Sequence, residues 1–122
     1  MSARVLLVED DEMCQEIVTE YAEDSGFEVD TADDGAQALA LVETHNYKLI
    51  LMDIMMPTMD GIEATQRIRA MADPEKSQVP IVAITARNPL LEQESWAAAG
   101  INDVIGKPFE EDDLIGMLKR YL

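Results

Sequence analysis

Residues 5–11 read VLLVEDD, four apolar residues followed at once by three acidic ones. A continuous apolar run of this length is typical of a strand that is buried on both faces of a sheet. Comparable runs occur at 48–52 and 80–84, with a shorter one at 102–105 and a weaker candidate at 28–31. The sequence therefore predicts five strands, and the continuous runs favour a parallel sheet.

Amphipathic stretches separate these strands. The helical spacing i, i+3, i+4, i+7 is met at Cys14, Ile17, Val18 and Tyr21 and again at Ala36, Leu39, Ala40 and Glu43. Further helices are predicted at 62–71, about 90–98 and 110–121. Five βα units fit a single α/β domain, with helices on both faces of a parallel sheet. A closed eight-fold barrel would need about twice this chain length.

Composition and charge narrow the class of protein. The chain has 122 residues, of which 48% are hydrophobic and 28% charged, as expected for one globular domain. Its 9 Lys and Arg against 25 Asp and Glu give a formal net charge of −16. Nucleic acid and anionic membranes are therefore disfavoured as direct partners, since both bind clustered basic residues. We expect a cytoplasmic protein for two reasons. The single cysteine cannot form an internal disulfide, and no apolar run approaches the roughly 18 residues that a membrane span needs.

The predicted strand ends carry the chemically interesting side chains. In open α/β sheets, ligands bind beyond the carboxyl ends of the strands. The residues found there are Glu9, Asp10, Asp11, Glu12, Asp53, Thr85 and Lys107. Neighbouring carboxylates repel one another unless a cation lies among them, and oxygen ligands favour a hard divalent ion. The sequence therefore predicts a Mg²⁺ site, with Mn²⁺ as the alternative ion, and phosphate chemistry beside it.

Four motifs carry a family resemblance, in the order VLLVEDD at 5–11, LILMDIMMPTMDG at 49–61, IVAITA at 81–86 and GKPF at 106–109. Together they resemble the receiver domain of two-component response regulators. The resemblance covers essentially the whole chain and implies a single receiver domain over residues 1–122. The fold that it implies is flavodoxin-like and doubly wound, with a five-stranded parallel sheet in the strand order 2-1-3-4-5.

The resemblance also assigns roles to the residues at the strand ends. It implies that Asp53 accepts a phosphoryl group from a phosphohistidine on a histidine kinase or histidine phosphotransfer protein. The implied Mg²⁺ ligands are Glu9, Asp10, Asp53 and the backbone carbonyl of Met55. Thr85 and Lys107 would contact phosphoryl oxygens. A signalling phospho-acceptor is implied rather than an enzyme, with self-phosphorylation and slow autodephosphorylation as its only reactions.

Two features of the motifs leave alternatives open. A shift of one residue would make Asp10 and Asp11 the metal-binding pair, although Glu9 and Asp10 follow the strand directly. Val104 stands where receivers often carry Tyr or Phe, so the aromatic part of the usual switch is absent. A β-branched aliphatic side chain is stiff and has no ring to turn inward. The switch mechanism is therefore open even if Asp53 is phosphorylated.

The sequence also offers candidate residues for partner contacts and alternatives to the phospho-acceptor function. Met13 and Phe109 could form an apolar patch beside the acidic pocket or pack in the core; Val104 and Pro108 are further candidate contacts. A receiver-like binding module that signals without phosphorylation is the alternative function. An aspartyl phosphatase would need a second acid where Met55 stands, and a nucleotide-binding domain would need a Gly-rich loop that the first motif lacks. The downstream partner is not indicated, and the chain could stand alone or belong to a larger regulator or hybrid kinase.

Overall fold

The computed structural model describes residues 4–53, 61–85, 97–106 and 109–121. The predicted helix at about 90–98 lies largely outside these residues, and 97–99 are helical. Among the helices of the described part, none is long and apolar enough to cross a membrane.

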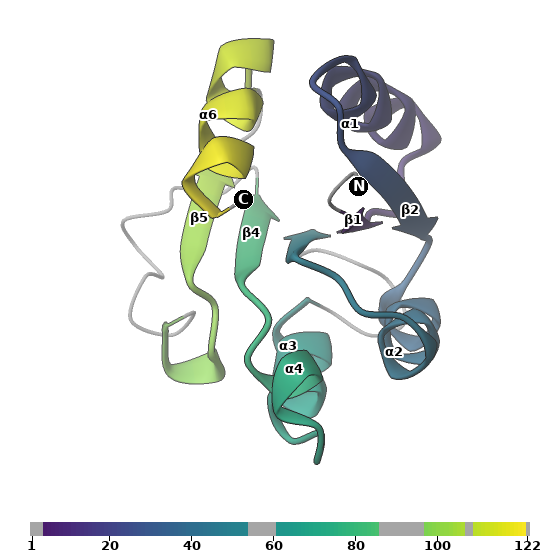
Figure 1. Ribbon diagram of the computed structural model, residues 1–122, viewed down its shortest axis with the longest axis vertical. Helices are drawn as coiled ribbons and strands as arrows, with labels where there is room; N and C mark the ends of the chain where they lie inside the picture. Colours follow the sequence, from purple (N-terminus) through teal and green to yellow (C-terminus); the bar gives the residue numbers. More distant parts are fainter. Residues whose placement is uncertain (1–3, 54–60, 86–96, 107–108, 122) are drawn as a thin grey trace.

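Five parallel strands form one sheet, each within one residue of its predicted bounds. The strands are β1 (Arg4–Val8), β2 (Glu28–Ala32), β3 (Leu49–Asp53), β4 (Ile81–Thr85) and β5 (Asp103–Gly106). Their order is β2-β1-β3-β4-β5, and all neighbouring pairs are parallel. The predicted doubly wound α/β fold is therefore confirmed (Figure 1).

Helices cover both faces of the sheet. The helices whose bounds fall within the described residues are α1 (Glu12–Asp24), α2 (Gly35–Thr44), α3 (Gly61–Arg69), α4 (Pro74–Ser77) and α6 (Glu111–Tyr121). Helices α1 and α6 lie on one face, and α2 and α3 on the other (Figure 1). The single-turn helix α4 was not predicted. Its start has a recognisable signal, because the Asp73 carboxylate accepts from the Glu75 amide at 3.0 Å and Pro74 occupies the first helical position.

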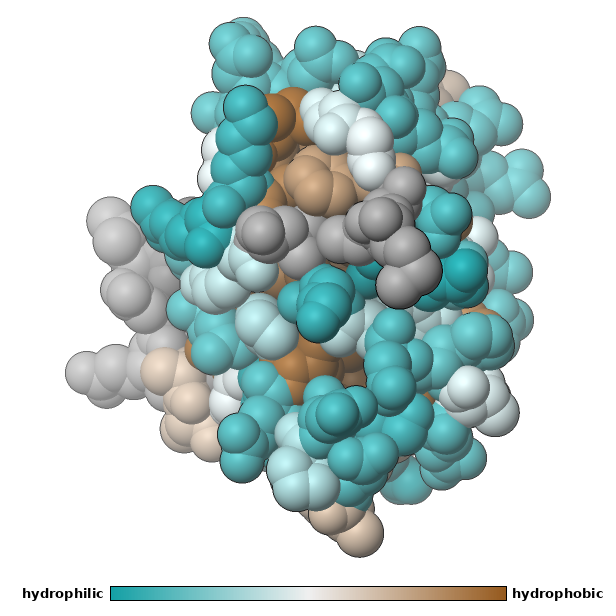
Figure 2. Space-filling view, viewed as in Figure 1, coloured by the Kyte–Doolittle hydropathy of each residue, from teal (hydrophilic) through white to brown (hydrophobic). Residues whose placement is uncertain are grey.

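The strand residues divide the core into two halves. On one side, Leu6, Val8, Ile50 and Met52 pack with residues of α2 and α3. On the other side, Val5, Leu7, Leu49 and Leu51 pack with residues of α1 and α6. Because alternate side chains point to opposite faces, both sets must be apolar, and the strand reads as an unbroken apolar run. Outside this core the surface is largely hydrophilic on the face shown in Figure 2, with apolar side chains visible only in small patches.

The prediction of which face of α2 is buried is wrong. Its buried residues are Gly35, Ala38 and Val42, whereas Ala36 and Ala40 of the predicted stripe are exposed. Alanine and glycine gain little from burial, so they do not define the orientation of a helix. The orientation instead follows the one β-branched aliphatic side chain of the helix, which packs against the sheet.

Helix α1 differs from its predicted stripe at one position. Val18 and Ala22 are fully buried, and Cys14 and Tyr21 pack against the same half of the core. Ile17 is 41% exposed. The apolar arc of α1 is thus wider than the face that the core covers, and its edge is left at the surface.

Candidate functional site

Three buried polar side chains gather at the carboxyl edge of the sheet. Glu9 follows β1 directly, Asp53 is the last residue of β3, and Thr85 is the last residue of β4. Val8 pairs with Met52 across β1 and β3, so the ends of these strands lie side by side. The exposed fractions of Glu9, Asp53 and Thr85 are 1%, 5% and 1%. The strand register therefore brings together three of the predicted site residues.

Burial of polar side chains is rare elsewhere in the part of the chain that the structure describes. Thr65 is the one further buried polar residue there, and its hydroxyl donates to the Gly61 carbonyl at 2.7 Å within α3. That contact satisfies a helix-internal hydroxyl and needs no functional explanation. The buried polar groups at the sheet edge instead come from the ends of three different strands, which makes the edge the candidate functional site.

Three carboxylates form a cluster at this edge. One carboxylate oxygen each from Glu9, Asp10 and Asp53 lies within 4.8 Å of the other two. Glu9 and Asp53 are buried, and Asp10 is exposed. Bringing carboxylates this close, away from water, is unfavourable unless a cation offsets their charge. A set of oxygen ligands that opens to solvent at one member fits a hard divalent cation such as Mg²⁺.

The conformation of the turn after β1 places some of its acidic side chains in the cluster and others outside it. The Asp11 carboxylate caps α1, because its Oδ1 accepts from the Met13 amide at 3.1 Å. The Asp11 amide in turn donates to Oε1 of Glu9 at 3.2 Å. The cluster thus contains Glu9 and Asp10, while Asp11 stabilises the helix that follows. This geometry favours Glu9 and Asp10 as the metal-binding pair over the alternative pair of Asp10 and Asp11.

Three further predicted site residues cannot be placed on the structure. Met55, Lys107 and Pro108 lie outside the described residues, so their roles stay predictions. The described chain reaches Gly106, which pairs with Thr85 across β4 and β5.

The candidate partner contacts are placed differently from one another. Phe109 is partly buried and packs against the half of the core that includes α1 and α6. Val104 packs partly buried against the other half. Met13 is 69% exposed. Phe109 therefore packs with the core, whereas Met13 lies at the surface, and their roles in partner contact stay predictions.

Sequence reasoning assigned no functional role to two residues of α1, Ile17 and Gln15. Ile17 lies one helical turn beyond Met13 and is exposed, although its spacing suggested a core position. Gln15 contacts two loops at the sheet edge. The excess width of the apolar arc of α1 could have indicated Ile17. No local pattern indicates Gln15, because its contacts depend on the arrangement of three segments.

Comparison with known proteins defines the class to which this fold and site belong. The model of the response regulator receiver domain matches residues 5–119. The chain belongs to this family, the receiver domains of two-component signalling, and the resemblance carried by the four motifs is confirmed.

Relatives of this chain include a regulator and two solved structures. The transcriptional regulatory protein YrkP of Bacillus subtilis is 41% identical over 99% of this chain and 52% of its own length. Chemotaxis protein CheY4 of Vibrio cholerae has a TM-score of 0.93 and 30% identity, with full coverage of both chains. The receiver domain of sensor histidine kinase PA1611 from Pseudomonas aeruginosa, solved with magnesium in its active site cleft, has a TM-score of 0.89 and 37% identity over 99% of this chain and 98% of that one. The chain thus spans only part of such relatives, 52% of YrkP and 7% of hybrid signal transduction histidine kinase B of Dictyostelium discoideum.

Proposed function

We propose that this chain is a phospho-acceptor in which Asp53 takes a phosphoryl group from a phosphohistidine on a histidine kinase or histidine phosphotransfer protein. The reaction requires Mg²⁺, and the phosphorylated chain signals through contacts with other proteins. The observation that carries the proposal is the position of Asp53. Its carboxylate lies at the carboxyl end of β3, buried, in one cluster with Glu9 and Asp10. Membership of the receiver family supports the same assignment.

Phosphoryl transfer to Asp53 is a displacement at phosphorus. A carboxylate oxygen forms the new P–O bond while the P–N bond to the donor imidazole breaks, and the electron pair of that bond stays on the imidazole nitrogen. Aspartate is a weak nucleophile, so the reaction depends on position and on compensation of charge. The buried placement of Asp53 at a rigid strand end limits the directions in which its carboxylate can point.

The residues around Asp53 have separate roles in this proposal. The ligands for Mg²⁺ are Glu9, Asp10, Asp53 and the backbone carbonyl of Met55. Bound Mg²⁺ supplies positive charge that offsets the carboxylates and the incoming phosphoryl oxygens. The Thr85 hydroxyl donates to one phosphoryl oxygen, which its buried position at the end of β4 supports. The Lys107 ammonium pairs with another.

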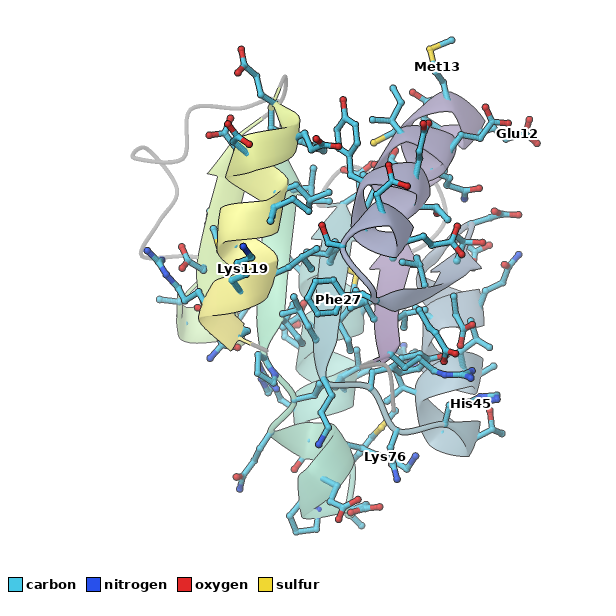
Figure 3. All side chains as sticks on the ribbon, turned by 45° about the horizontal axis from the view of Figure 1, so that its top comes forward. Glu12, Met13, Phe27, His45, Lys76 and Lys119 are labelled. Atoms are coloured by element: carbon cyan, nitrogen blue, oxygen red, sulfur yellow. The ribbon has the colours of Figure 1, made fainter. Side chains whose placement is uncertain are left out.

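A surface on α1 is proposed to dock the phosphohistidine-bearing partner. Met13 and Ile17 are the large hydrophobic side chains that are exposed in the described part of the chain, at 69% and 41%. They lie four residues apart and so share one face of the helix. Helix α1 begins next to the acidic cluster, and Figure 3 shows Met13 and Glu12 projecting from that end. A partner held by this face would present its histidine close to Asp53.

Intact mass spectrometry tests the phosphorylation of Asp53. The wild type, Asp53→Asn and Asp112→Asn are each incubated with acetyl phosphate and Mg²⁺. We expect one added phosphoryl group in the wild type and in Asp112→Asn, whose exposed carboxylate lies in α6, and none in Asp53→Asn. A wild type that gains nothing would favour the binding module that works without phosphorylation. A stable gain in Asp53→Asn would show that another residue is the acceptor.

A further inference from the structure

Gln15 links three segments at the carboxyl edge of the sheet. Its side chain lies in α1 and is half-buried. The Nε2 amide donates both to the backbone carbonyl of Glu9 and to Oδ1 of Asp33, the latter at 2.9 Å. Asp33 belongs to the loop between β2 and α2. One side chain therefore connects α1, the acidic turn and the neighbouring loop.

Among the described residues, the hydrogen bond from Gln15 is one of three that hold Glu9 in place. The Glu9 amide donates to the Ala32 carbonyl at 2.9 Å, and its carboxylate accepts from the Asp11 amide at 3.2 Å. With the carbonyl held by Gln15, the backbone on both sides of the Glu9 α-carbon is anchored. Because Glu9 is 1% exposed, its carboxylate has little room to reorient, and its direction depends on this backbone. Asp10 is attached to the anchored carbonyl and shares the dependence.

We propose that Gln15 is a positioning residue of the metal centre, holding the turn at 9–11 so that the Glu9 and Asp10 carboxylates are preorganised for a divalent cation. This inference rests on the proposed function. Groups that hydrogen-bond to metal ligands orient them, and losing such a group typically weakens metal binding by about 10–100-fold. Here the contact is to the ligand's backbone, so we expect an effect at the lower end of that range.

The chemistry of an amide suits this position. Gln15 offers two N–H donors on one nitrogen, which match the two acceptors that it contacts. It also carries no charge. A lysine or arginine could satisfy the same acceptors, but its positive charge beside the cluster would compete with a divalent cation. The amide therefore bridges two acidic segments without reducing the negative potential that attracts the ion.

Replacing Gln15 with methionine tests the proposal, because Gln15→Met keeps the length and the neutral charge and removes both donors. Gln37→Met is the matched control. Gln37 belongs to the same network, since its Oε1 accepts from the Asp33 amide at 3.0 Å, but no contact joins it to Glu9 among the described hydrogen bonds. The dissociation constant for Mg²⁺ is measured by calorimetry at 25 °C, and the Tm is measured without Mg²⁺.

We expect Gln15→Met to bind Mg²⁺ about tenfold more weakly than the wild type, with a similar Tm in the absence of the ion. Gln37→Met should stay within about twofold, because Glu9 keeps its anchor in that variant. Equal affinities in the wild type and Gln15→Met, or equal losses in both variants, would overturn the inference. A wild type that binds no Mg²⁺ would instead overturn the proposed function, and this inference with it.

A second variant covers the case in which Gln15→Met does not fold. Gln15→Glu keeps the length and polarity of the side chain but cannot donate. Its added negative charge alone would strengthen Mg²⁺ binding, whereas loss of the anchor weakens it. We expect weaker binding; unchanged or tighter binding would contradict the positioning role.

Discussion

The guanidinium of Arg69, at the end of α3, donates twice to the backbone carbonyl of Gly100, from Nε at 3.0 Å and from Nη2 at 2.7 Å. The approach is close enough that a Cβ on residue 100 would lie 2.8 Å from Cγ of Arg69. Gly100 also has a φ of +105°, which L side chains rarely adopt. Glycine is therefore the residue that fits at position 100, beside the Arg69 side chain.

Arg69 also donates to the segment that enters β4 and to the one that enters β5. Its Nη1 donates to the carbonyls of Ser77 and Val79 at 2.8 and 2.7 Å, and Nη2 donates to the Asn102 side chain at 2.8 Å. Burial lowers the pKa of this guanidinium. Arg69 therefore joins α3 to both segments at the edge of the sheet opposite the acidic cluster.

Removing the donors of Arg69 should destabilise the fold. We expect Arg69→Met to lower the free energy of unfolding by about 2–4 kcal/mol, because several carbonyls lose a charged donor. Arg67→Met on the same helix is the control, since Arg67 is exposed and pairs with Glu63 at 3.3 Å one turn away. It should cost about 0.5 kcal/mol or less. Urea unfolding measures both, and similar losses in the two variants would contradict the special role of Arg69.

Tyr47 should make stability fall at alkaline pH. Its hydroxyl donates to Asp30 at 2.8 Å, and burial, followed by this hydrogen bond, raises the pKa of Tyr47 above its ordinary value. Below about pH 10 both folded and unfolded chains keep the phenol proton. As the pH rises further the unfolded chain loses it first, so the stability that Tyr47 contributes is lost progressively toward its folded pKa.

Tyr47→Phe tests this pH dependence. At pH 7 we expect the variant to be about 1 kcal/mol less stable, because the hydrogen bond to Asp30 is lost. Above pH 10 its stability should decline less steeply than that of the wild type, so the two curves converge. Guanidinium unfolding at several pH values between 7 and 11 measures the slopes. Parallel curves would show that Tyr47 does not carry the effect.

Mg²⁺ should stabilise the fold through Asp10 rather than Asp11. At a concentration ten times its dissociation constant, a bound ion adds about 1.4 kcal/mol to the free energy of unfolding. Asp10→Asn should lose most of the resulting rise in Tm. Asp11→Asn should keep it, because asparagine retains the acceptor that caps α1. The reverse result would assign the metal to the register shifted by one residue.

Substitutions on the exposed apolar face of α1 should slow phosphoryl transfer from a protein donor but not from a small-molecule donor. Met13→Ser and Ile17→Ser each remove apolar area that a docked partner would cover, and about tenfold slower transfer from a phosphorylated histidine kinase or phosphotransfer protein is expected. Phosphorylation by acetyl phosphate should be unchanged, because that donor needs no docking face. Glu23→Ser, at the far end of α1, is the control. An equal loss with both donors would mean that the variants disturb the acidic cluster instead.

The sequence was sufficient to predict the sheet and the buried members of the cluster. Residues such as Leu51 and Ile84 lie between two layers of helices, so their strands must read as continuous apolar runs. The polar residue that ends such a run, Asp53 or Thr85, then falls at the carboxyl edge. These positions follow from local patterns alone.

The remaining features depend on contacts between distant segments. The alanines of α2 do not define its buried face, and Gln15 contacts Asp33, which is 18 residues away in the sequence. Arg69 contacts Gly100 across 31 residues. Contacts of this kind exist only after the elements have packed together, so a pattern along the chain does not reveal them.

The central claim, that Asp53 is the phosphoryl acceptor, is tested most directly by locating the modified residue. The wild type is treated with acetyl phosphate and Mg²⁺, reduced with borohydride, which converts an acyl phosphate to an alcohol, and mapped by peptide mass spectrometry. We predict a reduced side chain at position 53 and at no other acidic residue. Reduction at Asp10 or Asp11 with Asp53 unchanged, or no reduced residue at all, would contradict the assignment.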